Sequence, residues 1–333
     1  MSLKASSMLI SAAICGQVLC GSGAMAQVPE GYDIANWKNF STSAVTYSFD
    51  DGTANQIPVA IPLLDKYNFK GSFNLVTDWV KDWSAWKKVA DNGHEIASHT
   101  VSHKNFGQIT EDIQEQELRD SKQIIEKNIG RECITMVYPY CARGNDNIVA
   151  KYYISARSCS GHIENPKPQN MFDITSLGVG TESQTNSAKA FNDWVDNGVS
   201  QNGWAVFLIH AIDNDGGYSP INSSDFEQHL KYVSSNPQKF WVATFAQVSK
   251  YILERNSLNI KEKVTKKAVD VIVTCTDKTE ITKLDEPITI SRKLPDGWTT
   301  AKVKCGQQQV ESKIKDNKLI FNVIPGNNYK IVK

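Results

Sequence analysis

Four groups of polar residues stand out because each directly follows or ends a short apolar run. They are Asp50-Asp51-Gly52, the histidines His99 and His103, the segment Tyr138-Pro139-Tyr140, and His210. Taken singly, each has an ordinary structural interpretation, such as a turn or a hydrogen-bonded histidine. In parallel sheets and barrels, however, active sites assemble at the carboxyl ends of the strands. The coincidence of all four groups therefore predicts one catalytic site.

The aspartates and the histidine pair have the types and spacing of a metal site. Adjacent carboxylates repel each other unless a cation or a shared proton offsets their charge. Two imidazoles in His-x-x-x-His spacing can reach one ion. A carboxylate then completes three protein ligands and leaves a position open, as in catalytic zinc sites. We predict that Asp51, His99 and His103 bind a divalent ion, with Zn²⁺ preferred, and that Asp50 stays free as a base.

Short apolar runs alternate with longer amphipathic patterns from residue 44 to about residue 255. This alternation is typical of a parallel α/β sheet, and about seven strands favour a barrel-like closure over an open sheet. The expected strands are residues 44–49, 71–76, 95–98, 134–138, 174–177, 204–209 and 239–243, with a weaker strand pattern near 154–157. The expected helices are residues 57–67, 83–92, 111–127, 188–197, 225–234 and 245–255.

The chain after Asn256 has a different pattern. A basic stretch at 261–267 is followed by short β-branched runs at 271–276, 287–292, 300–305, 319–323 and 329–332. Turn signals such as Pro295-Asp296-Gly297 separate them, which predicts a small antiparallel β module. We therefore divide the chain into a leader at 1–26, a catalytic domain at 27–256 and a β-rich module at 257–333.

The first 26 residues have the features of a secretory signal peptide. Lys4 gives a positive start, residues 8–19 are largely apolar, and Ala24-Met25-Ala26 offers a small-x-small cleavage site. A lipoprotein anchor on Cys15 or Cys20 is the competing interpretation. The apolar run is too short for a membrane span, which needs about 20 residues, and no other stretch could span a bilayer. We expect a secreted or periplasmic, soluble protein.

The charge balance and the cysteine content limit the expected binding partners and disulfide bonds. The 333 residues include 36 basic and 36 acidic side chains, so no bulk charge favours nucleic acid, and we expect a monomer without a nucleic-acid partner. Five cysteines remain after the predicted cleavage, so at least one stays unpaired within the chain. The preferred disulfide is Cys275–Cys305, because the two lie close together in one module. No Cys-x-x-Cys pair occurs.

Three motifs in order carry a family resemblance. They are Ser48-Phe49-Asp50-Asp51-Gly52, Ser98-His99-Thr100-Val101-Ser102-His103 and Leu208-Ile209-His210. With them the sequence resembles the polysaccharide deacetylase family of carbohydrate esterases, the NodB-homology group, over roughly residues 44–255. The resemblance implies a distorted (β/α) barrel and metal-dependent removal of acetyl groups from sugars.

The resemblance also implies a role for each matched residue. Asp50 would be the general base, Asp51, His99 and His103 the metal ligands, and His210 the general acid.

The third motif departs from the family's common form, Arg-Pro-Pro-Tyr, because Val137 stands where the arginine that steadies the base would be. The Tyr-Pro-Tyr version is similar to the branch that acts on poly-N-acetylglucosamine. The main-chain N–H of Tyr140 is a candidate oxyanion donor. The fourth motif has no clear match, and the nearest candidates are Arg157 and Asp173.

Aromatic residues near the motifs are candidates for contacts with sugar rings, since their flat apolar faces can stack on such rings. Trp79 belongs to a cluster with Trp83 and Trp86, and Tyr218 lies in the loop after His210. Asp213 in that loop could contact hydroxyls or an amine. The competing interpretation is that the tryptophans form the apolar face of a helix and that the acid is simply solvated.

Three functions fit these residues. The preferred one is a deacetylase that hydrolyses N-acetyl groups of a polysaccharide or oligosaccharide, with an acetylated glycan as its partner. The alternatives are an O-acetyl esterase of the acetylxylan type and a non-catalytic carbohydrate-binding protein on the same scaffold. The presence of both Asp50 and His210 disfavours the binding protein, because a pure binder needs neither a base nor an acid.

Overall fold

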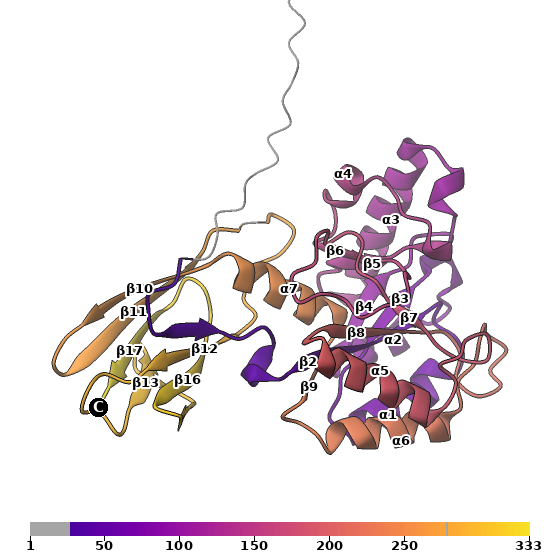
Figure 1. Ribbon diagram of the computed structural model, residues 1–333. Helices are drawn as coiled ribbons and strands as arrows, with labels where there is room; N and C mark the ends of the chain where they lie inside the picture. Colours follow the sequence, from indigo (N-terminus) through magenta and orange to yellow (C-terminus); the bar gives the residue numbers. More distant parts are fainter. Residues whose placement is uncertain (1–26, 278) are drawn as a thin grey trace, which may run out of the picture.

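The computed structural model describes residues 27–277 and 279–333 of the chain. The predicted signal peptide, residues 1–26, lies outside the described residues. Figure 1 shows an α/β part on the right and a smaller, all-β part on the left, which contains the C-terminus. Within the described ranges, no helix is long and apolar enough to cross a membrane.

A parallel sheet forms the centre of the α/β part. The order of its strands is β6-β5-β4-β3-β2-β8-β7, and β9 also pairs with β2. All eight residues of β2 are buried, as expected for a parallel strand that is covered on both faces and reads as a nearly continuous apolar run. The strands are β2 (Ser43–Asp50), β3 (Ser72–Leu75), β4 (Glu95–Ser98), β5 (Thr135–Val137), β6 (Ser155–Arg157), β7 (Leu177–Gly178), β8 (Trp204–Ile209) and β9 (Phe240–Val242).

One short segment brings the two edges of this sheet together. Ile174 forms a parallel bridge with Arg157 of β6. Three residues later, Leu177 of β7 pairs with Phe207 of β8. The sheet therefore curls into a distorted barrel, and the predicted fold class is confirmed.

Helices cover the outside of the curled sheet (Figure 1). Several begin with the cap residues that satisfy free N–H groups at a helix start: Asp82 caps α2, Ser187 caps α5, and Thr244 forms a capping box with Gln247 at α7. The helices are α1 (Ile61–Lys66), α2 (Trp83–Asp91), α3 (Glu111–Ile129), α4 (Asp146–Val149), α5 (Ala188–Ser200), α6 (Ser223–Ser234) and α7 (Phe245–Asn256). Only the short α4 was not expected from the sequence.

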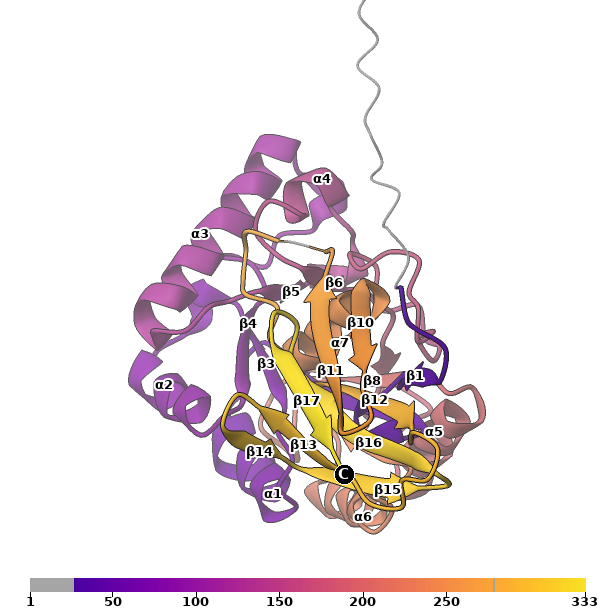
Figure 2. The ribbon, with the colours of Figure 1, turned by 90° about the vertical axis from the view of Figure 1, so that its left-hand side faces the viewer.

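The all-β part consists of two antiparallel sheets with an apolar core between them. Four strands form one sheet in the order β1-β12-β16-β15, and five form the other in the order β10-β11-β17-β13-β14. Figure 2 looks onto the five-stranded sheet, with the α/β part behind it. The strands are β1 (Tyr32–Ile34), β10 (Leu258–Val264), β11 (Ala268–Cys275), β12 (Ile288–Lys293), β13 (Lys302–Cys305), β14 (Gln308–Val310), β15 (Ser312–Lys315), β16 (Lys318–Val323) and β17 (Asn328–Val332).

One strand crosses the predicted division of the chain at residue 256. The prediction placed residues 27–256 together, but β1 pairs antiparallel with β12, with Tyr32 opposite Arg292. The pairing therefore places the start of the described chain in the β sheets. A strand of three residues is too short to show an alternating pattern, so β1 could not be predicted from the sequence.

The predicted Cys275–Cys305 disulfide is wrong. Cys275 ends β11 and Cys305 ends β13, and β17 lies between these strands. Two strand spacings amount to about 10 Å, whereas a disulfide spans Cα atoms no more than about 7 Å apart. The structure instead pairs Cys141 with Cys159, whose Cα atoms are 5.7 Å apart, and leaves Cys133 as a buried free thiol.

Candidate active site

The predicted site residues converge because their strands are neighbours in the sheet. Asp50 is the last residue of β2, and His99 and His210 directly follow β4 and β8. Strands β4, β3, β2 and β8 are consecutive in the sheet, so their carboxyl ends form one edge. The sequence prediction relied on this geometry, and the structure brings the groups together as expected.

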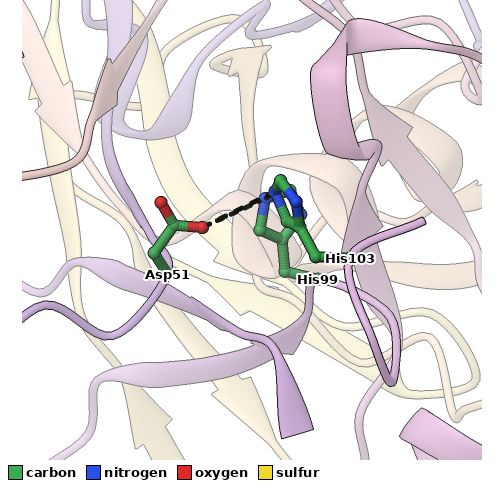
Figure 3. Close-up of side chains that lie close together, drawn as sticks. All are labelled: Asp51, His99 and His103. Carbon is green, nitrogen blue, oxygen red and sulfur yellow. Dashed lines mark hydrogen bonds and ion pairs between the residues drawn. The ribbon is translucent and has the colours of Figure 1, made fainter. Parts of the chain in front are cut away.

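Asp51, His99 and His103 form a compact cluster of possible ligands (Figure 3). Oδ1 of Asp51 lies 3.6 Å from Nε2 of His99 and 3.7 Å from Nε2 of His103. The two Nε2 atoms are 3.1 Å apart. All three ligand atoms lie within 4.8 Å of one another.

The chemistry of these donors fits a divalent cation. The Nδ1–H of His99 donates to the main-chain oxygen of Val137 at 3.0 Å, which leaves the lone pair on Nε2 free for a ligand. Among the described residues, the buried Oδ1 of Asp51 has no hydrogen-bond donor. A buried carboxylate oxygen without a donor, facing two imidazole nitrogens, is the arrangement that a cation would complete.

Burial and charge set the protonation of the cluster. Burial lowers the pKa of His99 to about 4, so its ring is neutral and can act as a ligand. Burial and the charge of Asp50 raise the pKa of Asp51 to about 7, in spite of the opposing charge of Arg157. The two adjacent carboxylates therefore repel each other in the absence of a cation, as the sequence suggested.

Several residues of the site have left-handed backbone conformations. The φ angles are 72° at Asp51, 69° at Thr100, 58° at His103, 56° at Tyr140 and 58° at Cys141. Such conformations cost about 1–3 kcal/mol each for residues other than glycine and persist only where the surroundings impose them. Their concentration at one sheet edge is itself evidence for a functional site.

Glu117 of α3 holds the loop that connects the two histidines. Its Oε2 accepts the N–H groups of Val101 and Ser102, both at 2.9 Å, and its Oε1 accepts the Ser102 hydroxyl at 2.6 Å. Sequence reasoning missed this residue. The available signal was a glutamate on the apolar face of α3, beside the buried Leu118.

Arg157 supplies the positive charge that the third motif lacks. Its guanidinium donates to Oδ2 of the buried Asp50, and Asn74 donates to Oδ1 at 2.8 Å. Arg157 of β6 lies directly opposite Val137 of β5 in the register of the sheet. Asp50 is thus paired with an arginine from the strand next to the one that leads into the third motif. The sequence had offered Arg157 only as a candidate for the fourth motif.

The charges around Asp50 keep it ionised. Burial alone would raise its pKa, but the charge and the hydrogen bond of Arg157 oppose burial, and the pKa lies below its usual value. An ionised carboxylate that is also fixed by two donors has the properties of a general base.

His210 lies on the other side of Asp50, at the end of β8. Its ring packs edge-on against Tyr218, with 5.1 Å between the ring centroids. Burial lowers its pKa, and the charge of Asp50 opposes this effect. The side-chain amide of Gln56, which sequence reasoning also missed, donates to the main-chain oxygens of both Asp50 and His210, at 2.6 and 3.0 Å, and so joins the two strand ends.

Three exposed aromatic side chains contact histidines of the site. Trp79 and Tyr140 contact His103, with centroid distances of 5.1 and 4.6 Å, and Tyr218 contacts His210. Their exposed fractions are 49%, 65% and 61% in that order. The predicted tryptophan cluster does not act as one group. Trp79 is exposed beside His103, whereas Trp86 is buried against Phe73 in the core.

Asp213 and Asp173, the two acids that the sequence suggested as candidates, form hydrogen bonds with other residues of the chain. Oδ1 of Asp213 accepts the N–H of Ser223 at 2.9 Å, at the start of α6. Asp173 accepts from Arg143 and from the hydroxyl of Ser158, at 2.8 and 2.7 Å. These contacts order the loops, and the structure shows neither acid among the residues that meet at the ligand cluster.

Comparisons with known proteins bear on the identity of this site. Residues 38–153 match the family model described as polysaccharide deacetylase. A gellan lyase from Bacillus sp. is 29% identical over 291 residues, which are 80% of this chain and 12% of that protein. A peptidoglycan-N-acetylglucosamine deacetylase from Bacillus cereus is 27% identical over 103 residues, which are 30% of this chain and 38% of that protein. The chain therefore spans well under half the length of both relatives.

A solved structure has the same fold. It is a chain from Mycobacterium smegmatis described as a polysaccharide deacetylase, with a TM-score of 0.54 and 17% identity, and the match covers 69% of this chain and 95% of that one. At this identity the match concerns the fold. It agrees with the curled parallel sheet described above.

Proposed function

Because residues 38–153 belong to the polysaccharide deacetylase family, as predicted, we propose that the protein is a secreted, metal-dependent deacetylase of an N-acetylated polysaccharide or oligosaccharide. The observation that carries the proposal is the convergence of Asp51, His99 and His103 beside an ionised, arginine-bound Asp50. Membership of a family of carbohydrate esterases makes the chain a hydrolase. The metal, the amide bond and the glycan are our proposals.

Asp51, His99 and His103 would hold the divalent ion, which we propose to be Zn²⁺ because two neutral imidazoles and a carboxylate suit that ion. When bound, the ion supplies Lewis acidity toward the acetyl carbonyl oxygen. The protein fixes the ligands in advance through the Val137 carbonyl and Glu117.

The other residues divide the proton transfers between them. Asp50 takes a proton from the attacking water, and Arg157 keeps it charged for that step. The N–H of Tyr140 donates to the carbonyl oxygen as negative charge develops there. His210 gives a proton to the departing nitrogen as the C–N bond breaks, so that acetate and a free amine result.

An amide substrate explains why an acid is needed. An amine is a poor leaving group until it is protonated, whereas a sugar hydroxyl leaves more easily from an ester. His210 lies on the opposite side of Asp50 from the loop with His99 and His103. A proton donor at this position suits the hydrolysis of an amide, which is the more difficult of the two reactions. The relative from Bacillus cereus, named for a deacetylase of N-acetylglucosamine, supports the same choice.

Two further features support the substrate class and the compartment. Trp79, Tyr140 and Tyr218 present exposed ring faces around the cluster, and such faces stack on sugar rings. The Cys141–Cys159 disulfide is typical of proteins in oxidising compartments and therefore supports export.

The test is acetate release from chitin oligomers, poly-N-acetylglucosamine, peptidoglycan and acetylated xylan. We expect activity on an N-acetylated glycan that disappears on chelation and returns with added Zn²⁺. Activity on acetylated xylan alone would favour the O-acetyl esterase. Sugar binding without any acetate release would favour the carbohydrate-binding protein and contradict our proposal.

Asp50→Asn is the matched variant for the base. It keeps the shape of the side chain, and we expect it to retain the metal while kcat falls by about 10²–10⁴-fold, the usual contribution of a general base. An active Asp50→Asn protein with normal metal content would show that another group removes the proton.

A further inference from the structure

The Cys141–Cys159 disulfide joins two segments that each carry a residue of the site. Cys141 directly follows Tyr140, and Cys159 follows Arg157 by two residues. We propose that this disulfide is a positioning element of the active site, which holds the main-chain N–H of Tyr140 in the conformation that the reaction needs. The inference rests on the proposed deacetylase function.

The backbone at Tyr140 needs an external constraint. Tyr140 and Cys141 have φ angles of 56° and 58°, both in the left-handed region that residues other than glycine avoid. Tyr140 is 65% exposed, and its ring contacts the His103 ring, so burial does little to hold it in place beyond that one contact. Main-chain bonds in the turn are few, since Cys141 N–H donates to Tyr138 at 3.3 Å and Ala142 N–H donates to Pro139 at 3.0 Å. A covalent bond at Cys141 adds a constraint to these few contacts.

The same bond couples the turn to the base. The N–H of Tyr138 donates to the main-chain oxygen of Arg157 at 3.1 Å, so the ends of β5 and β6 are already joined there. The disulfide makes a second connection beyond that point. The turn with Tyr140 and the strand end with Arg157, which is bonded to Asp50, are therefore fixed relative to each other.

Two variants and one control test the proposal. Cys141→Ser with Cys159→Ser removes the bond. Cys141→Gly with Cys159→Ser also removes it but relieves the left-handed strain at residue 141, because glycine tolerates that conformation. Cys275→Ser with Cys305→Ser changes two free cysteines of the β sheets and serves as the control.

We expect the Cys141→Ser, Cys159→Ser protein to keep its metal content and KM. Its kcat should fall by about ten- to a hundredfold, because the N–H of Tyr140 is no longer held in place. Amide hydrogen exchange in residues 140–143 should become faster by about tenfold, since the turn opens locally. The Cys141→Gly, Cys159→Ser protein should regain part of the lost kcat. The Cys275→Ser, Cys305→Ser control should have the kcat of the wild type. A purely structural role would lower thermal stability without this loss of kcat at a temperature where the protein is folded.

The proposal is overturned if the Cys141→Ser, Cys159→Ser protein keeps full kcat or loses the metal. It is also overturned if the Cys275→Ser, Cys305→Ser control loses as much activity. If the wild type releases no acetate from any glycan, the proposed function fails, and hydrogen exchange decides the inference alone. Unchanged exchange in residues 140–143 of the Cys141→Ser, Cys159→Ser protein would then show that the disulfide does not hold the turn.

Discussion

At the residue scale, the proposed base Asp50 is half of a buried ion pair with Arg157. Asp50 was identifiable from the sequence because it ends an apolar run beside Asp51. Its partner was not, because Arg157 lies 107 residues further along the chain. The register of β5 and β6, which sets Arg157 opposite Val137, brings the arginine next to the third motif, and only the tertiary structure reveals this.

Arg157→Gln should leave Asp50 without its counter-charge. We expect kcat to fall by about 10²-fold, since a small displacement of a catalytic group has an effect of this size. The free energy of unfolding should fall by about 3–5 kcal/mol, as for a buried pair that loses one partner. Arg157→Lys keeps the charge and is the control, which should retain more activity. Steady-state kinetics with metal analysis would check this, and unchanged kcat in Arg157→Gln would contradict the role of the pair.

At the scale of elements, loops at the strand ends hold the ligands, and helices hold the loops. Glu117 of α3 binds two N–H groups of the loop between the histidines, and His103 at the end of that loop has a left-handed backbone. The His-x-x-x-His spacing was readable from the sequence. The support from α3 was not, because a polar residue on a buried helix face has no partner until the sheet and helix pack together.

Glu117→Gln should weaken metal binding without removing a ligand. An amide presents one acceptor oxygen where the carboxylate uses two, so one of the loop contacts is lost. We expect metal affinity to fall by about 10–100-fold, which is the usual effect of changing a residue that orients the metal ligands. Competition with a chelator would measure it. Glu115→Gln on the same helix, which is exposed and bonded to Lys151, is the control and should bind metal as the wild type does.

At the scale of the whole molecule, α7 joins the two parts. The hydroxyl of Tyr251 donates to the main-chain oxygen of Ala35 at 3.0 Å. Arg255 bonds to the main-chain oxygens of Asn36 and Pro166. Glu254 accepts the N–H of Glu286 at 3.0 Å, while its buried Oε2 has no partner within the part of the chain that the structure describes.

This junction should make stability depend on pH. Burial raises the pKa of Glu254 from its ordinary value of 4.5 to about 8, helped by the charges of Glu286 and Asp285. The folded protein then binds a proton that the unfolded chain releases, so this stabilisation is present at low pH and is lost as the pH rises toward 8. Glu254→Gln should raise the free energy of unfolding by about 2 kcal/mol at pH 9 relative to the wild type. The difference should shrink near pH 5.

Thermal unfolding of both proteins across this pH range is the measurement. Glu115→Gln, a change of the same kind at an exposed site, should follow the wild type. A Glu254→Gln protein whose melting temperature changes with pH as the wild type's does would show that Glu254 is charged throughout.

The sequence by itself determined the alternation of strands and helices, the family resemblance and the candidate ligand residues. These depend on short spacings, because a strand places its end residue at a known edge of a parallel sheet. The tertiary structure alone decided the partner of Asp50, the Cys141–Cys159 disulfide and the place of β1 beside β12. Each of these joins residues through the pairing of strands or the packing of loops, and no local pattern of residues specifies which strands become neighbours.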